Sequence, residues 1–261
     1  MSLRTRRAPE LSANWKQEAR RLAAAKRVVL ILDFDGTLVP LTTGQPKLAL
    51  LSGPARNVLQ RIARGSKTTI VIISGRRRRD LQRRVRIKGI KYWGWYGWER
   101  GRAPTMSMAR KKAIRHARLV LAERLKGLQG VWLENKRLSL VLHCRGAAQA
   151  TRNRAKKILH QVLGHDQEHL GILWNDRAWE VMPKGYEGKG QALRVELAKR
   201  EFHKALPIFF GDDHSDESAF GVLRGGLTIR VGKSRPTLAR FSVRDPQGVL
   251  QVLREMEALL R

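Results

Sequence analysis

Three features that would place the chain in a special class of protein are missing or scarce in its 261 residues. Cysteine occurs once, at Cys144, so no intrachain disulfide can form and a reducing compartment is expected. No apolar run approaches the length of a membrane span, and residues 1–25 lack the apolar core of a signal peptide. We therefore expect a soluble, cytoplasmic protein.

Acidic residues are also scarce, since 22 Asp and Glu stand against 53 Lys and Arg, giving a formal net charge of +31. Such a balance favours contact with nucleic acid or attraction of anionic substrates. The positive residues, however, are spread from Arg4 to Arg261, and the densest run covers only residues 76–79. No zinc-finger or RNP-type pattern accompanies them. The composition therefore disfavours nucleic acid as the main partner and leaves the role of the charge open.

What the sequence does contain is an apolar stretch that ends in two carboxylates. Residues 28–32 are all β-branched or Leu, which predicts a strand buried on both faces inside a parallel sheet. Asp33 and Asp35 follow, and Gly36 supplies a sharp turn. Residues two apart on an extended chain point the same way, so both carboxylates can serve one site. Asp-x-Asp-Gly also occurs in ordinary turns and calcium loops, but the closing Glu of a calcium loop is missing here.

The alternation of apolar strands with amphipathic helices indicates the architecture of the core. Strands are predicted at residues 28–32, 68–73 and 89–98, with helices between them at 52–64 and 79–86. This β-α-β-α-β order predicts an α/β fold, a Rossmann-like parallel sheet with crossover helices.

The middle third of the chain has a different pattern. Its order αββαββ predicts an antiparallel sheet backed by two helices. An α+β module inserted into a parallel core is expected to act as a cap that specifies the substrate. The predicted organisation is a core of residues 1–104 and 185–261 with a cap at 105–184. Residues 1–12 are basic without a clear pattern and are expected to be frayed.

Polar residues that can converge on one site stand at four junctions of the predicted core. They are Asp33 with Asp35, Ser74, Lys189, and Asp212 with Asp213. Each has an ordinary explanation by itself: Ser74 in a turn, Lys189 at a solvated helix start, and Asp213 in a helix cap. In an open α/β sheet, however, ligands bind beyond the carboxyl ends of the strands, where these junctions fall. Their joint occurrence favours phosphoryl transfer to a carboxylate nucleophile.

The junctions carry the groups that this chemistry needs. We expect Asp33 to attack phosphorus and form an aspartyl-phosphate, and Asp35 to protonate the leaving alcohol and then activate water. We expect Mg²⁺ to be held through oxygen atoms of Asp33, Asp212 and the backbone carbonyl of Asp35. Ser74 and Lys189 would donate hydrogen bonds to the phosphoryl group.

Four motifs resemble those of the haloacid dehalogenase superfamily phosphatases in order and spacing. They are Asp-Phe-Asp-Gly-Thr-Leu at 33–38, Ser-Gly-Arg at 74–76, Lys-Gly at 189–190 and Gly-Asp-Asp-x-x-Asp-Glu at 211–217. The resemblance implies a Mg²⁺-dependent phosphatase with a Rossmann-like core and an inserted α+β cap. It also implies that Gly75 and Arg76 contact the substrate, and that Asp213 and Asp216 support the metal ligands.

The middle third resembles the cap of trehalose-6-phosphate phosphatases. The motifs are Glu-Asn-Lys at 134–136, His-Cys-Arg at 143–145 and Trp-Glu-Val-x-Pro at 179–183. In that family the Glu and Lys of the first motif, and the Glu before the Pro, bind sugar hydroxyls. This implies substrate-binding roles for Glu134, Lys136 and Glu180, and also for Arg145. The pair Glu134 and Lys136 could otherwise be a solvated hairpin tip.

Some positions depart from the family's pattern, since Cys144, Ser215 and Tyr96 stand where it usually has Tyr, Thr and His. The resemblance implies hydrolysis of a small-molecule sugar phosphate, trehalose 6-phosphate, to trehalose and phosphate in trehalose biosynthesis. Two alternatives stay open. One is a phosphatase for another sugar phosphate, such as glucosylglycerol or sucrose phosphate, and the other is a basic nucleic-acid-binding protein or polynucleotide phosphatase. The sequence leaves the exact sugar, the oligomeric state and any opening of the cap undecided.

Overall fold

The computed structural model describes residues 5–41, 49–101, 105–144, 146–175, 178–186 and 188–260. The chain divides into two compact units. Unit 1 is built from residues 1–103 and 189–261, and unit 2 from residues 104–188. None of the described helices combines the length and apolar character needed to cross a bilayer. The cytoplasmic location stays a prediction.

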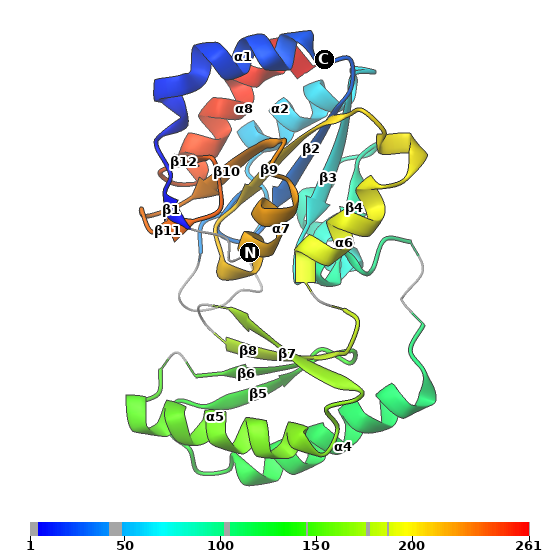
Figure 1. Cartoon of the computed structure of the whole chain (residues 1–261), viewed down its shortest axis with the longest axis vertical. Helices are drawn as coiled ribbons and strands as arrows, with labels where there is room; N and C mark the ends of the chain where they lie inside the picture. Colours follow the sequence, from blue (N-terminus) through cyan, green and yellow to red (C-terminus); the bar gives the residue numbers. More distant parts are fainter. Residues whose placement is uncertain are drawn as a thin grey trace. The chain divides into compact units, whose positions relative to one another are not determined.

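Unit 1 contains a parallel sheet, which confirms the expected α/β class. Of the described strands, six form this sheet in the order β12–β10–β9–β2–β3–β4, and every neighbouring pair is parallel (Figure 1). The strands are β2 (Val28–Asp33), β3 (Thr68–Ile73), β4 (Lys91–Trp93), β9 (Leu206–Gly211), β10 (Leu227–Val231) and β12 (Phe241–Val243).

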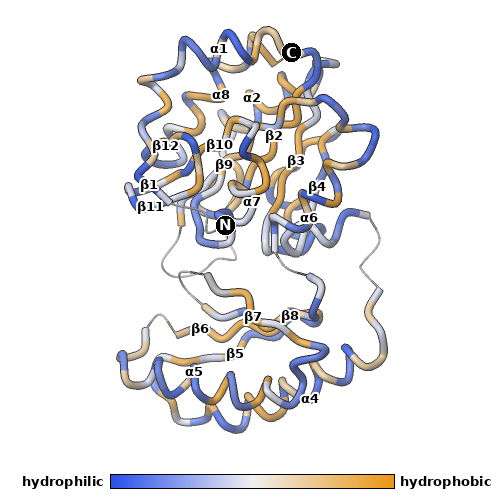
Figure 2. The backbone as a smooth tube through the Cα atoms, viewed as in Figure 1, coloured by the Kyte–Doolittle hydropathy of each residue, from blue (hydrophilic) through white to orange (hydrophobic). Residues whose placement is uncertain are grey.

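The apolar residues of β2 are buried because they face both sides of the sheet. Val28, Leu30 and Leu32 belong to one hydrophobic cluster, and Val29 and Ile31 to another. Each fully buried side chain of this kind stabilises the fold by about 1.5–3 kcal/mol. Figure 2 shows the strands of unit 1 as a mainly hydrophobic layer.

Helices cover both faces of the sheet in unit 1 and supply the rest of the two clusters. The first cluster takes apolar residues from α1 (Trp15–Ala24), α2 (Gly53–Ala63), α3 (Arg78–Val85) and α8 (Pro246–Leu260). The second takes them from α6 (Gly188–Leu197) and α7 (His214–Val222). Central strands such as β2 are therefore covered on both faces, which places their carboxyl ends as the open edge where ligands bind.

Two sequence predictions about local structure are wrong. Residues 6–7 are not frayed, because β1 (Arg6–Arg7) pairs with β11 (Pro236–Thr237), and the backbone N–H of Ser242 donates to the carbonyl of Pro9 at 2.8 Å. The predicted strand at 89–98 ends at Trp93, where the chain turns into the 3₁₀ helix η3 (Trp95–Gly97). Further 3₁₀ turns are η1 (Leu11–Asn14) and η4 (Arg200–Phe202).

Unit 2 has the order αββαββ. Of its described strands, four form an antiparallel sheet in the order β5–β6–β8–β7. Two helices lie along one face of it and share its hydrophobic cluster (Figure 1). The elements are α4 (Met108–Arg124), β5 (Trp132–Asn135), β6 (Leu140–His143), α5 (Gln149–Gly164), β7 (Leu170–Asn175) and β8 (Ala178–Pro183). That this unit acts as a cap stays a prediction.

Candidate active site

The loop after β2 presents the first two predicted site residues at the carboxyl edge of the sheet. Asp33 ends the strand and is 4% exposed. The loop is closed by the N–H of Gly36 donating to the carbonyl of Val39 at 2.8 Å. Gly36 has φ +89°, and a Cβ there would lie 2.1 Å from Oδ2 of Asp212. Only glycine therefore allows the loop to turn this tightly against the carboxylate that follows β9.

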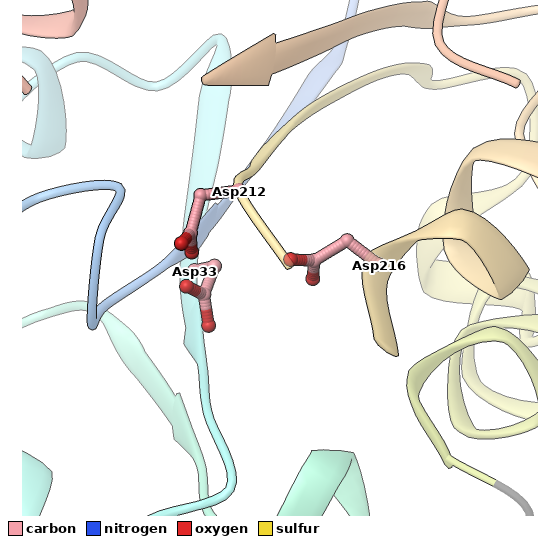
Figure 3. Close-up of side chains that lie close together, drawn as sticks. All are labelled: Asp33, Asp212 and Asp216. Carbon is pink, nitrogen blue, oxygen red and sulfur yellow. The ribbon is translucent and has the colours of Figure 1, made fainter. Parts of the chain in front are cut away.

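Three carboxylates meet beside this loop. Asp33, Asp212 and Asp216 each offer an oxygen atom within 4.8 Å of the others, and they come from β2, the end of β9 and the first turn of α7 (Figure 3). Burial raises the pKa of Asp33 to about 7, against the opposing charge of Lys189. Burial and the charge of Asp33 raise the pKa of Asp212 to about 9. The cluster thus carries more negative charge than its surroundings stabilise, which is the setting in which a cation binds.

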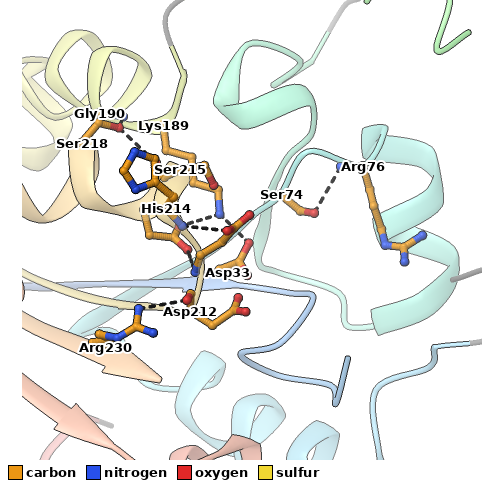
Figure 4. Close-up of polar contacts among 12 residues, drawn as sticks. Asp33, Ser74, Arg76, Lys189, Gly190, Asp212, His214, Ser215, Ser218 and Arg230 are labelled. Atoms are coloured by element: carbon orange, nitrogen blue, oxygen red, sulfur yellow. Dashed lines mark hydrogen bonds and ion pairs between the residues drawn. The ribbon is translucent and has the colours of Figure 1, made fainter. Parts of the chain in front are cut away.

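Lys189 is the cation that the chain itself supplies. Its Nζ donates to Oδ1 of Asp33 at 2.5 Å and to Oδ1 of Asp216 at 2.6 Å, and the residue is 2% exposed (Figure 4). Burial would lower the pKa of Lys189, but the charges of Asp216 and Asp33 outweigh it and raise this pKa. Next to it, the N–H of Gly190 donates to Oγ of Ser218, where a Cβ would meet the Ser218 carbonyl oxygen at 2.5 Å. Lys189 is therefore a charged, fixed donor beside Asp33.

Asp213 and Asp216 organise the start of α7. The Asp213 carboxylate accepts from the N–H of His214 at 2.7 Å, and Oδ2 of Asp216 accepts from the N–H of Asp213 at 2.9 Å. With Oδ1 of Asp216 on Lys189, both oxygens of Asp216 are engaged. The helix consequently begins at His214, with Asp213 as its N-cap.

The donor set suits a hard divalent cation. Among the described residues, Asp33 uses only Oδ1 in its hydrogen bonds, and Asp216 is committed to Lys189 and the helix cap. Asp33, Asp212 and Asp216 each bring a carboxylate oxygen to the cluster, and carboxylate oxygen is the ligand that Mg²⁺ prefers. The backbone carbonyl of Asp212 helps to fix the end of β9, because it accepts a hydrogen bond from Nη1 of Arg230 at 3.0 Å (Figure 4).

Ser74 and Arg76 follow the neighbouring strand β3. Ser74 is 3% exposed, and its Oγ accepts from the N–H of Arg76 at 3.1 Å. The Arg76 guanidinium makes a bidentate pair with Asp35, with both distances 2.7 Å, and also contacts Asp80 at 3.1 Å. The structure therefore pairs Arg76, for which a substrate contact is predicted, with the predicted acid–base residue.

The loop at residues 94–99, where a strand was expected, packs against this motif. The ring of Tyr96 lies against Gly75, where a Cβ would be 2.7 Å from Cζ. The N–H of Tyr96 donates to the carbonyl of Ser74, and that of Trp95 to the carbonyl of Arg76. Trp95 and Tyr96 have φ of 51° and 57°, a left-handed conformation that costs about 1–3 kcal/mol at each non-glycine residue. Strain of this kind persists where it positions a site, here residues 74–76. In the sequence, the spacing Gly-x-x-Gly-x-Glu at 94–99 marks this loop.

The predicted sugar-binding residues lie in unit 2. Glu180 is fully buried, and its carboxylate accepts from Oγ of Ser139 at 2.5 Å and from Nζ of Lys136 at 3.4 Å. Oε2 of Glu134 lies 2.9 Å from Nε2 of His143. The sheet brings these side chains together because Glu134 and Glu180 both pair with Val141 of β6. Arg145 lies outside the described residues.

Comparison with known proteins agrees with the fold and the motifs. A family model described as trehalose-phosphatase matches residues 31–247. The chain is 31% identical to probable trehalose-phosphate phosphatase 9 of Oryza sativa subsp. japonica, over 94% of this chain and 74% of that protein. It is 29% identical to trehalose 6-phosphate phosphatase RA3 of Zea mays, over 90% of this chain and 72% of that protein.

Solved structures show the same fold. The C-terminal domain of trehalose-6-phosphate phosphatase from C. albicans has a TM-score of 0.77 at 22% identity, covering 96% of this chain and 98% of that one. A haloacid dehalogenase-like hydrolase from Bacteroides thetaiotaomicron has a TM-score of 0.62 at 16% identity, covering 88% of this chain and all of that one, 100%. Because the family model covers most of the chain, the chain belongs to the trehalose-phosphatase family and is a phosphatase that hydrolyses a phosphoric monoester.

Proposed function

We propose that the protein is a Mg²⁺-dependent phosphatase that hydrolyses trehalose 6-phosphate to trehalose and phosphate through an aspartyl-phosphate on Asp33. The observation that carries the proposal is the buried contact between Lys189 and Asp33, 2.5 Å long, at the carboxyl end of β2 beside the carboxylate of Asp212. It supplies a nucleophile with a fixed, charged partner. Relatives named as trehalose-phosphate phosphatases support the choice of substrate.

In the first half of the reaction, one carboxylate oxygen of Asp33 forms a bond to phosphorus, and the bond from phosphorus to the sugar oxygen breaks. Asp35 gives a proton to the departing oxygen, so that the sugar leaves as a neutral alcohol. In the second half Asp35 takes a proton from water, the water oxygen bonds to phosphorus, and the bond to Asp33 breaks. Inorganic phosphate leaves, and both carboxyl groups return to their first state.

Fixed donors position the phosphoryl group during both halves. Lys189 keeps its ammonium beside Asp33, and the buried hydroxyl of Ser74 stands at the end of the adjacent strand. Donors that are already in place stabilise developing charge without reorganisation. Gly75 would offer its backbone N–H next to Ser74, and its lack of a side chain leaves room for the ring of Tyr96.

The pair between Arg76 and Asp35 sets a condition on this mechanism. Asp35 must pass a proton to the leaving oxygen, whereas both of its carboxylate oxygens accept hydrogen bonds from the Arg76 guanidinium. Turnover therefore requires that Arg76 move off Asp35. An arriving phosphate dianion is the natural competitor for the guanidinium, which is consistent with the substrate contact expected of Arg76.

Mg²⁺ would be held by the carboxylates of Asp33 and Asp212 and by the backbone carbonyl of Asp35. It would neutralise charge on the phosphoryl oxygens and on the cluster itself. Asp213 and Asp216 support this arrangement by capping α7 and holding Lys189.

In unit 2, Glu134, Lys136 and Glu180 would bind hydroxyl groups of the sugar, with Arg145 as a further contact. Charged groups make strong hydrogen bonds to hydroxyls, and leaving them unpaired is costly. They would thus select for a sugar phosphate over a simple ester.

A turnover assay across a panel of phosphate esters tests the proposal. The panel holds trehalose 6-phosphate, sucrose phosphate, glucosylglycerol phosphate, glucose 6-phosphate and a short 5′-phosphorylated oligonucleotide, each with Mg²⁺ and with EDTA. We expect the highest kcat/KM for trehalose 6-phosphate and no turnover in EDTA. A higher kcat/KM for any other member would reject the substrate, and undiminished activity in EDTA would reject the metal.

A further inference from the structure

The sheet of unit 2 has two unlike faces. Side chains alternate along a strand, so each strand contributes to both faces. Leu133, Leu142 and Val181 belong to the hydrophobic cluster shared with α4 and α5. Glu134 and Glu180 are their direct neighbours along β5 and β8 and therefore lie on the opposite face, which we call the polar face.

Trp132 is the unexpected residue of the polar face. It lies in β5, two residues before Glu134 on the same face, and it is 55% exposed. Its indole stacks on the imidazole of His143, directly opposite in the register, with ring centroids 3.7 Å apart and planes inclined by 9°. His143 in turn contacts Glu134 at 2.9 Å. The His143 ring, which is fixed by its contact with Glu134, therefore fixes the orientation of the Trp132 indole.

Stability of the fold does not explain this placement. An exposed indole gains little from the hydrophobic effect, which scales with the area removed from water. Within the described part of unit 2, the hydrophobic cluster contains the neighbours Val131 and Leu133 but not Trp132. The cluster would keep its composition without the indole. A large aromatic surface left open to solvent beside charged hydrogen-bonding groups is instead typical of a binding site.

A pyranose ring has the complementary shape and chemistry. Its C–H groups form an apolar face, and its hydroxyl groups form a polar rim. An aromatic ring is flat, apolar and negative on its face, which suits C–H groups, and carboxylates accept hydrogen bonds from the rim. We propose that Trp132, braced by His143, is a stacking platform for a pyranose ring of the substrate. This inference rests on the proposed function and names a specificity residue for it.

The spacing of the platform assigns it to a second sugar ring. Trp132 and Glu134 are two residues apart on one strand, about 6.8 Å. Glu134 and Glu180 lie on strands separated by β6, about 9.6 Å apart. The platform therefore stands beside the carboxylate pair, so one ring bound by the carboxylates leaves the platform to its neighbour. A phosphate of a disaccharide has that second ring, whereas glucose 6-phosphate and a glucosylglycerol do not.

The test compares Trp132→Ala, Trp132→Phe and a control, Leu119→Ala. Leu119 lies on α4 and is 56% exposed. The control variant therefore removes a similarly exposed apolar side chain, but away from the polar face. Each variant is assayed with Mg²⁺ on trehalose 6-phosphate, sucrose phosphate, glucose 6-phosphate and p-nitrophenyl phosphate, and its melting temperature is measured.

In Trp132→Ala we expect KM for trehalose 6-phosphate to rise roughly 2- to 12-fold, the range of an aromatic stacking contact. KM for glucose 6-phosphate and p-nitrophenyl phosphate should match that of Leu119→Ala, and Trp132→Phe should recover most of the loss because it keeps a flat ring. An equal loss on every ester, or no loss relative to Leu119→Ala, would overturn the platform.

The experiment distinguishes an error in the proposed substrate from an error in the proposed stacking role of Trp132. If the wild type prefers sucrose phosphate, trehalose is rejected, and the same variants on sucrose phosphate decide the platform. If the wild type prefers a monosaccharide phosphate, the platform for a second ring is overturned as well.

Discussion

The carboxylates clustered around Asp33 should repel one another and lower the stability of the fold, and removing one of their charges tests this. Burial, together with the charge of Asp33, raises the pKa of Asp212 to about 9 from an ordinary value of 3.8. A raised pKa means that the stability carried by this carboxyl is fully present below pH ~4 and is lost as the pH rises through 9. Between the ordinary value of 3.8 and pH 7 the protein therefore loses at most ~4 kcal/mol of its free energy of unfolding, since each pH unit is worth ~1.4 kcal/mol.

Asp212→Asn keeps the shape of the side chain and removes the charge. Asp33 and Asp216 remain near Lys189 in this variant and their ionisation adjusts to the change. We therefore expect Asp212→Asn to recover only part of this free energy of unfolding, about 1–3 kcal/mol in EDTA at pH 7–8. For a chain of this size, that corresponds to a melting temperature higher by about 2–10 °C. The gain should grow with pH between 5 and 9. Activity should be lost, because the variant gives up a carboxylate that would hold Mg²⁺.

The assay is thermal unfolding in EDTA and in Mg²⁺ across this pH range. Mg²⁺ should stabilise the wild type, by about 2.7 kcal/mol at a concentration of 100 Kd, but not Asp212→Asn. Asp216→Asn is the matched control, since the same chemical change leaves the buried ammonium of Lys189 with one carboxylate fewer and should destabilise the protein by about 3–5 kcal/mol. A lower melting temperature for Asp212→Asn than for the wild type in EDTA at pH 8 would refute the reasoning.

Three further outcomes are expected. Asp35→Asn should slow trehalose 6-phosphate turnover by ~10²–10⁴-fold, the usual contribution of a general acid–base group, and full activity would remove Asp35 from that role. Glu134→Ala, Lys136→Ala and Glu180→Ala should each cost ~1–3 kcal/mol in kcat/KM on trehalose 6-phosphate and little on p-nitrophenyl phosphate; equal losses on both would make these residues structural. With a net charge of +31, kcat/KM should fall as salt is added around 0.1 M, where the Debye length is ~10 Å, and a flat salt profile would exclude steering of the substrate.

The fold was predictable where a pattern is local. An unbroken apolar run at 28–32 predicts a strand covered on both faces. In the structure its side chains alternate between two hydrophobic clusters, one on each face of the sheet. Pairings between distant segments leave no such signal. The short strand β12 and the ladder of Arg6–Arg7 with Pro236–Thr237 are held by backbone hydrogen bonds, which any sequence can make.

In the candidate site, motif spacing predicted which residues gather but not how they pair. Nothing in the spacing indicates that Arg76 takes both oxygens of Asp35, because that depends on the side-chain conformations chosen in three dimensions. The stack of Trp132 on His143 is likewise a product of the β5–β6 register. The left-handed residues Trp95 and Tyr96 run against local backbone preference, so the sequence pattern predicts a strand there instead of a turn.

The most direct test of the mechanism is to look for phosphate on Asp33. Asp35→Asn is mixed with trehalose 6-phosphate labelled with phosphorus-32 in Mg²⁺, quenched in acid within milliseconds to seconds, digested, and the labelled peptide is identified by mass. The account predicts label on the peptide containing Asp33, released by hydroxylamine as expected of an acyl phosphate, and no label in Asp33→Asn. Turnover by the wild type without label on Asp33 at any time would contradict it.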